Sequence, residues 1–257
     1  MKISTILLSG AGNTFHLVGA DVSQLSIAEK KELTRSICTK DAADGLIFIR
    51  KNLADKNYQW DFYNNDGSDA EMCGNATRCV GYYIKNELKD PAPEWTLKTV
   101  AGNIVIRPLA HEQYEITMTK LELLKSSHGF YCNTGVPHLV LEIEKFEDYR
   151  ALKEQARHLR YGLEFLPAGT NVTYVKIDAS VKKMKAVTYE RGVEDFTEAC
   201  GTGAVAAAFY NLVLHSVSES SVEMPGGSLI VNLNNLDKPL MTGPANQIGK
   251  FNYEFKI

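Results

Sequence analysis

The first half of the chain carries short apolar or alternating stretches that are separated by turn residues. Four of these stretches have the length and composition of strands: residues 2–8, 15–20, 45–50 and 57–63. Between the second and the third, apolar residues at rough helical spacing predict an amphipathic helix over residues 26–37, with Ser26 as its N-cap. The pattern therefore predicts a strand-rich first half with an early helix.

Two of the later predicted helices directly follow cysteines. A helix of roughly fifteen residues follows Cys73, and an Ala-rich apolar helix follows Cys200. A further helix is predicted over residues 147–161. The remaining strands are predicted within residues 96–109, 111–121, 128–143, 170–178, 184–191, 221–235 and 239–257.

The two halves of the chain share one order of elements. Each half has a His-Leu-Val stretch, the start of a strand, a cysteine before a helix, and a glycine that opens a strand. The corresponding positions are residues 16–18 and 138–140, Leu46 and Val172, Cys73 and Cys200, and Gly102 and Gly227. Four matches in the same order indicate an internal repeat.

This repeat predicts an α+β fold of two pseudo-symmetric domains, each a mixed β-sheet or roll around a central helix. We expect the first domain to comprise residues 1–118 and 246–257, and the second to comprise residues 119–245. If the pseudo-symmetry brings the two copies face to face, the active site lies in the interdomain cleft, which is a common place for ligands.

The composition is that of an ordinary globular protein, with 257 residues of which 44% are hydrophobic and 23% are charged. The formal net charge of −3 gives no electrostatic reason to expect nucleic acid or an anionic membrane as a partner. The small basic cluster of Lys182, Lys183 and Lys185 is interpreted as a solvated face. The expected partner is a small-molecule amino acid substrate.

The apolar segments are too short for a membrane. No window reaches the ~18 apolar residues of a span, and the run from Ile3 to Leu8 is too short for the apolar region of a signal peptide. The five cysteines are odd in number and contain no C-x-x-C spacing, which argues against a disulfide framework or a zinc ribbon. We therefore expect a cytoplasmic protein with reduced thiols.

Cys73 and Cys200 each stand directly before a glycine that opens a helix. This position puts the thiol at the positive end of the helix, beside backbone N–H groups that the helix leaves unpaired. At Cys200 these are the N–H groups of Gly201, Thr202 and Gly203. A helix N-terminus lowers the pKa of a thiol and can hold a carboxylate, so the sequence predicts two activated thiols.

Two thiols on opposite sides of a small substrate suit the inversion of a carbon centre. One thiolate removes a proton and the opposite thiol delivers a proton to the other face, and each transfer is worth roughly 10²–10⁴-fold. Two helix N-termini aimed at one α-carboxylate would stabilise the charge that develops there. The sequence contains no metal cluster, phosphate loop or pyridoxal phosphate context, so we expect no cofactor and no metal.

These motifs resemble those of the diaminopimelate epimerase family, the cofactor-independent two-cysteine racemases of lysine and cell-wall biosynthesis. The resemblance covers essentially the whole chain. The motifs that carry it are Gly-Ala-Gly-Asn-Thr-Phe (10–15), the segment 62–79 with Asn-Asn-Asp-Gly and Cys-Gly-Asn, Gly-Val-Pro-His (135–138), Gly-Thr-Asn-Val (169–172), Glu-Arg-Gly (190–192), Ala-Cys-Gly-Thr-Gly-Ala (199–204) and Met-Pro-Gly-Gly (224–227).

The resemblance implies an epimerase that interconverts LL- and meso-diaminopimelate, with Cys73 and Cys200 as base and acid. It also implies that the α-carboxylate and the ammonium group are held near the two helix ends, that Arg191 pairs with the distal carboxylate, and that the protein is a homodimer. The residues that match substrate-binding positions of the family are Asn13, Asn64, Gly74, Asn75, Asn171, Glu190, Arg191, Gly201 and Thr202.

Three segments depart from the family pattern. Ala76-Thr77 follows Cys-Gly-Asn where the family usually has Gly-Ala, and Lys40-Asp41-Ala42 stands where Gly-x-Gly often precedes Ala-Asp. Val136 stands where some members have an asparagine that helps to bind the distal end of the substrate, and valine lacks the amide that forms such hydrogen bonds. The alternative is therefore a cofactor-independent racemase of another amino acid, such as histidine, in the same superfamily.

Simpler interpretations remain open for several residues in or near the motifs. Asn64 and Asp66 also suit a turn, and Arg78 also suits a structural ion pair. The residues that also suit the core are His16, His138, Cys38, Cys79 and Cys132. A thiol–disulfide protein or a non-catalytic binding module is the alternative of a different class.

Overall fold

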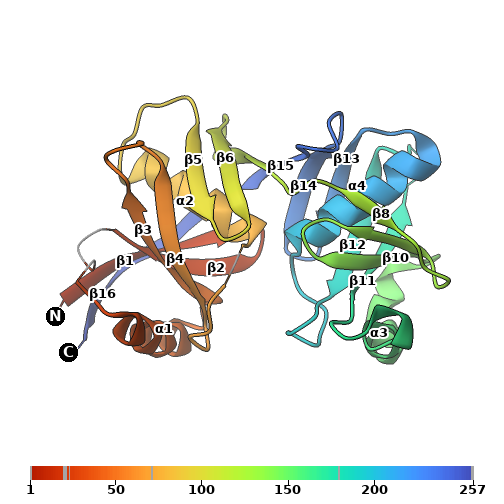
Figure 1. The fold of residues 1–257 in the computed structure, drawn as a ribbon, viewed down its shortest axis with the longest axis horizontal. Coiled ribbons are helices and arrows are strands. Elements are labelled where there is room, and N and C mark those ends of the chain that lie inside the picture. Colours follow the sequence, from red (N-terminus) through yellow and green to blue (C-terminus); the bar gives the residue numbers. More distant parts are fainter. Residues whose placement is uncertain (1, 20–21, 23, 71, 179, 256–257) are drawn as a thin grey trace. The chain divides into compact units, whose positions relative to one another are not determined.

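The computed structural model describes residues 2–19, 22, 24–70, 72–178 and 180–255 (Figure 1). The chain divides into two compact units, Met1–Ile116 with Pro244–Ile257 and Thr117–Gly243. The boundaries expected from the sequence, 118/119 and 245/246, lie close to these divisions. Residues 20, 256 and 257, which the predicted strands 15–20 and 239–257 include, lie outside the described residues.

The first unit is a mixed sheet with two helices. Its strand order is β16-β1-β2-β3-β4-β5-β6-β7, with parallel pairs β2–β3 and β4–β5 and antiparallel pairs elsewhere. The elements are β1 (Lys2–Gly10), β2 (Asn13–Val18), α1 (Ile27–Asp41), β3 (Gly45–Lys51), β4 (Tyr58–Asn64), α2 (Gly74–Asn86), β5 (Trp95–Thr99), β6 (Gly102–Pro108), β7 (Gln113–Thr117) and β16 (Asn246–Glu254).

The second unit repeats this plan element by element. Its strand order is β8-β9-β10-β11-β12-β13-β14-β15, and the parallel pairs, β10–β11 and β12–β13, stand at the same two places. The elements are β8 (Glu122–Leu124), β9 (Phe130–Asn133), β10 (Pro137–Glu142), η2 (Phe146–Leu152), α3 (Lys153–Arg160), η3 (Leu163–Phe165), β11 (Asn171–Ile177), β12 (Lys183–Tyr189), α4 (Gly201–His215), β13 (Glu219–Met224), β14 (Gly227–Asn232) and β15 (Leu240–Pro244).

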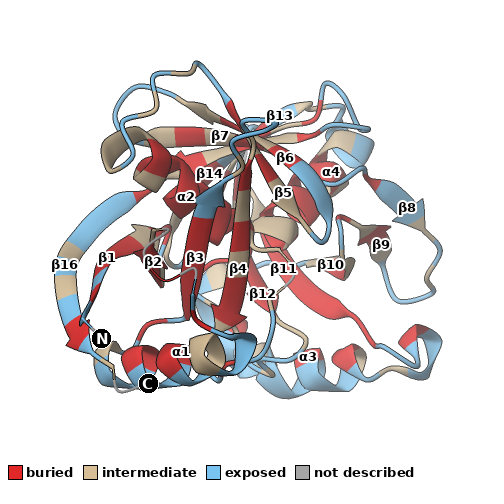
Figure 2. Ribbon diagram, turned by 60° about the vertical axis from the view of Figure 1, so that its left-hand side comes forward, coloured by how far each residue is buried: buried red, intermediate tan, exposed pale blue. Residues whose placement is uncertain are grey.

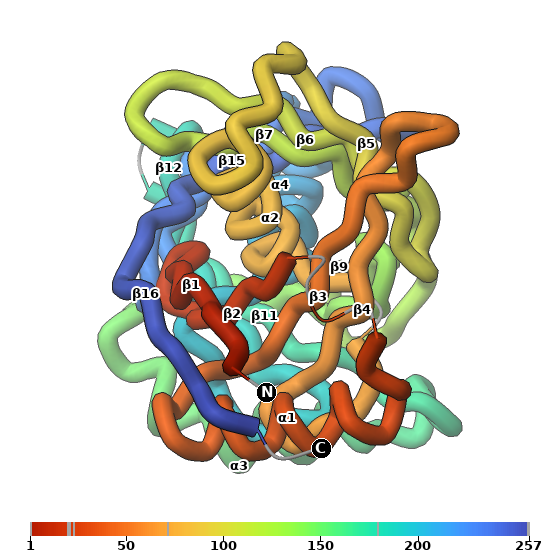
Figure 3. The backbone as a smooth tube through the Cα atoms, turned by 90° about the vertical axis from the view of Figure 1, so that its left-hand side faces the viewer, coloured from red at the N-terminus to blue at the C-terminus, as the bar shows by residue number. Residues whose placement is uncertain are grey.

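This shared order confirms the predicted fold class, a two-repeat α+β fold with mixed sheets. In each repeat the second helix is the central one. Helix α2 packs against β1, β2 and β6, and α4 packs against strands β9 to β14; Figure 3 shows α2 surrounded by strands of the first unit. Buried alanines at 204 and 206–208 let the strands approach α4 closely. Among the described residues, no helix combines the length and apolar character that a membrane span requires.

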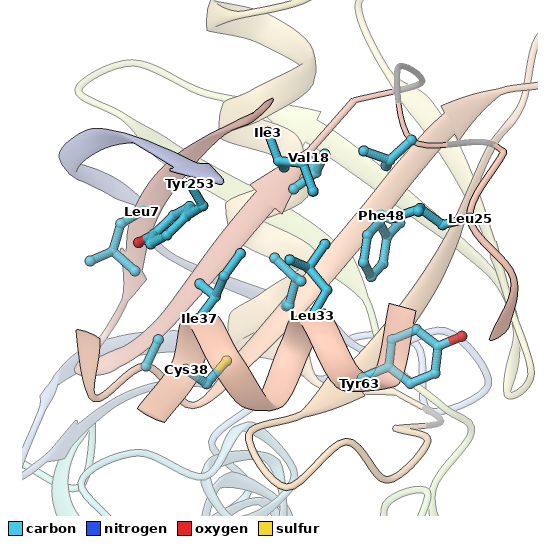
Figure 4. Packing of buried hydrophobic residues seen from close by; sticks show 13 residues of the cluster. Ile3, Leu7, Val18, Leu25, Leu33, Ile37, Cys38, Phe48, Tyr63 and Tyr253 are labelled. Atoms are coloured by element: carbon cyan, nitrogen blue, oxygen red, sulfur yellow. The ribbon is translucent and has the colours of Figure 1, made fainter. Parts of the chain in front are cut away.

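The first helix of each repeat covers the opposite face of the sheet. Helix α1 begins with a capping box in which Ser26 and Glu29 bond each other's backbone N–H groups. Its buried face, which includes Leu33 and Ile37, packs on strand residues such as Phe48 (Figure 4). The outer face of α1 is exposed, whereas β3 is buried over most of its length (Figure 2).

The prediction of a single helix over residues 147–161 is wrong for the first half of this segment. Residues Phe146–Leu152 form a 3₁₀ helix, and α3 begins only at Lys153. Phe146, Tyr149 and Leu152 pack into one cluster of the second unit. Side chains three residues apart eclipse one another on a 3₁₀ helix, whereas on an α-helix they share a face but are offset around the axis. Packing of these three side chains into one cluster therefore favours the tighter winding.

Candidate active site

Cys73 and Cys200 are the N-cap residues of α2 and α4. Both have an extended backbone, with φ and ψ of −143° and 124° at Cys73 and −129° and 105° at Cys200. In each case the helix begins at the following glycine, as the sequence predicts. Because the extended N-cap backbone turns into helix at once, each thiol lies at the positive end of its helix.

We call Asn13, Asp44, Cys73, Gly74 and Asn75 the Cys73 cluster. The buried Asn75 amide donates to Asn13 Oδ1 at 2.6 Å, and Asn13 Nδ2 donates to Asp44 Oδ2 at 3.3 Å. Asp44 also accepts from the Thr14 backbone N–H at 2.8 Å. The structure thus brings together four residues predicted from the sequence, and adds Asp44 as the residue that holds the start of β2 beside them.

The turn from β1 to β2 lies directly on the first turn of α2. A Cβ atom at Gly10 would be 2.6 Å from the Asn75 carbonyl oxygen and 3.2 Å from Cys79 Sγ. Only a residue without a side chain permits this approach. Gly10 therefore sets how close Asn13 comes to Asn75.

Arg78 lies under the Cys73 cluster and is fully buried. Its Nη2 donates to Asn75 Oδ1 at 2.8 Å and its Nε donates to the Pro244 carbonyl at 3.3 Å. The structural ion pair considered for Arg78 is not found among the described residues. Burial lowers the pKa of Arg78 to about 10, and the nearby Cys79 and Cys73 sulfurs act in the opposite direction.

Asn64 ends β4 in the Asn-Asn-Asp-Gly turn. Its Nδ2 donates to Ser68 Oγ at 3.0 Å, and Asp66 Oδ1 accepts from the Ser68 backbone N–H at 2.8 Å. The backbone N–H of Asn65 donates to the Asp44 carbonyl at 3.0 Å. Asp66 is thus a turn former, and the turn itself is bonded to the Cys73 cluster through Asp44.

We call Asn171, Glu190, Arg191, Cys200, Gly201 and Thr202 the Cys200 cluster. Cys200 is buried, with 7% of its surface exposed. Its sulfur accepts from the Gly203 backbone N–H at 3.4 Å and lies 3.4 Å from Thr202 Oγ1. Gly203 N–H is therefore paired with the thiol itself, and a Cβ atom at Gly203 would be only 2.1 Å from Thr188 Oγ1.

The thiol of Cys200 does not have the low pKa that its helix position predicts. Burial raises the pKa well above the ordinary value, and the charge of Glu190 raises it further. The hydrogen bond from the Gly203 backbone N–H lowers it, and a hydrogen bond donated by the Thr202 hydroxyl would lower it too, but both effects are smaller. Desolvation disfavours a buried thiolate more strongly than the end of one helix stabilises it, so Cys200 is held as a neutral thiol.

A tight turn after β12 carries Glu190 and Arg191. Thr197 Oγ1 donates to Glu190 Oε1 at 2.5 Å. The Arg191 backbone N–H donates to Asn171 Oδ1 at 2.8 Å, while Asn171 Nδ2 donates to the Pro137 carbonyl at 3.1 Å. Asn171 thus ties together the Gly-Val-Pro-His, Gly-Thr-Asn-Val and Glu-Arg-Gly segments.

The turn is braced by an ion pair that the sequence analysis missed. Arg160 lies at the end of α3, and its Nε and Nη2 atoms are each 3.1 Å from Glu194 Oε1. The same carboxylate oxygen accepts from the Gly192 backbone N–H at 3.0 Å. Gly169 has φ +71°, and a Cβ there would lie within 1.9 Å of Arg160 Nη1. The glycine of Gly-Thr-Asn-Val was the one available signal for this packing.

The two His-Leu-Val stretches are not equivalent in space. His16 lies 3.1 Å from Asp41 of α1, whereas His138 lies 3.0 Å from Thr202 of α4. In the parallel registers, His16 pairs with Leu46, whereas Leu139 pairs with Val172. Because Leu46 and Val172 are corresponding positions of the two repeats, His16 corresponds to Leu139, and Phe15 corresponds to His138. A shift of one residue moves a side chain to the other face of the sheet.

The other cysteines are buried thiols, as expected. Burial raises the pKa of Cys38, Cys79 and Cys132 to about 12 each. All five cysteines are described, and none is in a disulfide. Within the described ranges, no group of three or more histidine, cysteine or acidic residues is arranged to hold a metal ion.

The fold places this protein in a class of two-repeat α+β proteins. Two solved structures share the fold over 99% of this chain: a PhzF-family phenazine biosynthesis protein from Bacillus anthracis, at 13% identity and a TM-score of 0.80, and a probable proline racemase from Agrobacterium radiobacter K84, at 14% identity and a TM-score of 0.73. The matched regions cover 100% of the phenazine biosynthesis protein and 93% of the probable proline racemase. At such identities the likeness concerns the fold alone.

The family model for diaminopimelate epimerase matches residues 5–123 and again residues 130–248, one match for each repeat. A diaminopimelate epimerase of Hydrogenobaculum sp. (strain Y04AAS1) is 33% identical over 95% of this chain and 97% of its own length. That of Aquifex aeolicus (strain VF5) is 32% identical over 84% of both chains. The chain belongs to the diaminopimelate epimerase family, whose members are isomerases.

Proposed function

We propose that this protein is a diaminopimelate epimerase that interconverts the LL and meso forms of its substrate with two cysteines as base and acid. The observation that carries the proposal is that each repeat has a cysteine as the N-cap of its central helix. The family match over both repeats supports the substrate. The product would serve lysine and peptidoglycan precursor synthesis.

In the proposed reaction one sulfur, as thiolate, takes the α-proton and becomes a thiol. The electron pair left on the α-carbon is delocalised into the α-carboxylate, where the N–H groups at a helix start stabilise the added charge. The second thiol then gives its proton to the opposite face of the carbon and becomes a thiolate. Cys73 and Cys200 exchange these roles in the reverse direction, so both units must contribute to one substrate.

The substrate-binding roles follow from the same arrangement. Gly74 and Asn75 begin α2, and Gly201 and Thr202 begin α4, so their backbone N–H groups suit the α-carboxylate. We assign the ammonium group and the distal end to side chains beside these helix starts, with Arg191 as the partner of the distal carboxylate. These side chains are Asn13, Asn64, Asn171, Glu190 and Arg191.

The second candidate is a racemase of another amino acid, such as histidine. Val136 favours it, because this half-buried side chain offers no hydrogen bond at a position where some relatives have asparagine. Its backbone carbonyl accepts from the Thr134 N–H at 3.1 Å, so the backbone at Val136 already has a partner. A substrate with a different distal group would then fit better.

A substrate panel separates the two candidates. The reduced protein is incubated with LL-diaminopimelate, L-histidine and other L-amino acids, and the loss of optical activity is followed by circular dichroism. Turnover of diaminopimelate supports the proposal, and turnover of histidine without diaminopimelate supports the second candidate. The matched variant is Val136→Asn, which should favour diaminopimelate if this position contacts the distal end. No racemisation of any amino acid would contradict both.

A further inference from the structure

A chain of hydrogen bonds leads from the strands of the second unit to the Cys200 thiol. Thr188 Oγ1 lies 3.0 Å from Thr173 Oγ1, which lies 2.9 Å from Nδ1 of His138. Nε2 of His138 lies 3.0 Å from Thr202 Oγ1, which lies 3.4 Å from Cys200 Sγ. Thr173, Thr188 and His138 are completely buried, and among the described residues the hydrogen bonds that link them to the thiol pass through Thr202.

The direction of this chain is set by Asn171. Its Oδ1 accepts from the Arg191 backbone N–H and its Nδ2 donates to the Pro137 carbonyl, so the two ends of the amide cannot be exchanged. Nδ2 therefore faces His138 Nε2, at 3.5 Å. An amide N–H beside Nε2 favours this ring nitrogen as the acceptor.

The imidazole is neutral, so the acceptor at Nε2 places the ring proton on Nδ1. Burial lowers the pKa of His138 to about 3, and the charge of Arg191 acts in the same direction. Nδ1–H then donates to Thr173, whose hydroxyl can donate to Thr188. At the other nitrogen, the Thr202 hydroxyl donates to Nε2, and its oxygen is left to accept from the Cys200 S–H.

We infer that His138 is a positioning residue that acts through Thr202 to keep the proton on Cys200 in the resting enzyme. The inference rests on the proposed function and gives the two thiols different starting roles: Cys200 is the acid of the resting protein. It does not make His138 a base, because the proposed proton transfers use the two sulfurs.

Several groups that face the thiol affect whether it keeps its proton. Glu190, which follows β12, disfavours the thiolate by its charge and by a hydrogen bond with the thiol. In the inferred arrangement His138 on β10, which bonds Thr202, adds to this effect by making the Thr202 hydroxyl an acceptor. Arg191 disfavours an imidazolium at His138. The Gly203 N–H at the start of α4 favours the thiolate. The tautomer of His138 decides whether the Thr202 hydroxyl donates a hydrogen bond to the Cys200 sulfur or accepts one from it.

The variant Thr173→Val tests this dependence. It removes the acceptor of Nδ1–H at almost unchanged volume, so the ring proton is expected to move to Nε2 and the Thr202 hydroxyl to turn toward the sulfur as a donor. A donor stabilises the thiolate. The matched control is Thr34→Val in α1, a completely buried threonine whose hydroxyl donates to the Lys30 carbonyl at 2.8 Å.

Two measurements on the full chain without substrate decide the matter. The tautomer of His138 is read from ¹⁵N-histidine NMR spectra, with His138→Gln to assign its signals. The pH dependence of iodoacetamide labelling is measured separately for the Cys73 and Cys200 peptides. We expect a proton on Nδ1 in the wild type, and in Thr173→Val a fall of about one pH unit in the labelling midpoint of Cys200 alone, which is a tenfold effect.

A proton on Nε2 or an imidazolium in the wild-type protein would overturn the inference, and this outcome does not depend on how well the variant folds. An unshifted Cys200 midpoint in folded Thr173→Val would also overturn it, as would an equal shift in Thr34→Val. Absence of epimerase activity would contradict the proposed function. It would not affect the interpretation of these two measurements, since neither of them uses a substrate.

Discussion

Cys73 begins α2 as a half-buried residue above a buried arginine, whereas Cys200 begins α4 as a buried residue beside a carboxylate. The helix, the preceding extended residue and the following glycine are the same in both. What differs is supplied by side chains: Asn75 with the underlying Arg78 near Cys73, and Thr202 with Glu190 near Cys200. Repetition of the fold has preserved the backbone geometry and has made the two thiols chemically unequal.

This inequality suits the proposed reaction. A pair that works as base and acid needs one sulfur with a proton and one without at the start of each turnover. The surroundings of Cys200 favour a thiol, and the Arg78 cation near Cys73 favours a thiolate there.

Alanine at either N-cap cysteine should remove catalysis. Because each proton transfer contributes roughly 10²–10⁴-fold, Cys73→Ala and Cys200→Ala should each lower kcat by at least that factor with the protein still folded. Rates of racemisation and circular dichroism spectra are the measurements, with Cys132→Ala as the control at a buried cysteine outside both clusters. A variant that lacks one thiol and keeps more than a tenth of the wild-type rate would contradict the paired mechanism.

Glycine to alanine substitutions distinguish the packing of the two clusters. Both Gly10→Ala and Gly203→Ala should lower the free energy of unfolding by about 1–3 kcal/mol through overpacking. The Gly203 clash is with a side-chain oxygen, so Thr188→Ala should restore much of the stability of Gly203→Ala. The Gly10 clash is with the Asn75 carbonyl, so Cys79→Ala should not rescue Gly10→Ala. Denaturant unfolding of the single and double variants measures these changes in stability. Rescue of Gly10→Ala by Cys79→Ala, without rescue of Gly203→Ala by Thr188→Ala, would contradict the assigned contacts.

The Arg160–Glu194 brace has no counterpart described in the Cys73 cluster. Arg160→Gln should lower the free energy of unfolding by about 1–3 kcal/mol and raise KM more than it lowers kcat, since the loosened turn carries Arg191. The control on the same helix is Arg157→Gln, whose pair with Glu154 is exposed. Equal effects of the two substitutions would show that the brace has no special role.

The brace also predicts a pH dependence. Burial alone would raise the pKa of Glu194, but the Gly192 N–H and Arg160 outweigh it, and the pKa is lowered in the folded protein. Folding therefore favours the ionised carboxylate. Its stabilisation is present above the ordinary carboxyl pKa and is lost as the pH falls through the folded value. Acid unfolding of Arg160→Gln should show a weaker dependence over this range than that of Arg157→Gln.

The smallest effect is expected from the buried cation near Cys73. Arg78→Met should raise the midpoint of Cys73 labelling by up to about one pH unit, because the thiolate loses a nearby positive charge. The Cys200 midpoint should stay unchanged. The exposed Arg35→Met is the control, and a shift at both cysteines would indicate a general loosening in place of an electrostatic effect.

Much of the fold could be predicted because its signals are local. Ser26 and the spacing of apolar residues mark α1, and a cysteine before glycine marks the starts of α2 and α4. The order of these signals, repeated once, predicts two similar units. The segment 146–152 was mispredicted because a run of polar residues with apolar ones every third position also resembles an α-helix.

The electrostatics of the site could not be predicted in the same way. The pKa of Cys200 depends on burial and on Glu190, and the sequence alone does not show that burial outweighs the helix end. Thr173 and Thr188 look like ordinary strand residues, and their role appears only when the register places them beside His138. The match of His16 with His138 failed because a one-residue shift in a strand changes the face.

The central claim is that two different sulfurs take and give the α-proton. LL-diaminopimelate is incubated with the reduced enzyme in D₂O, and early product and remaining substrate are separated and analysed for α-deuterium by NMR. The account predicts that the first meso product carries deuterium at the inverted carbon while the remaining LL substrate carries almost none. Early product that keeps its original α-proton would contradict the account, because a single group would then have both removed and returned it.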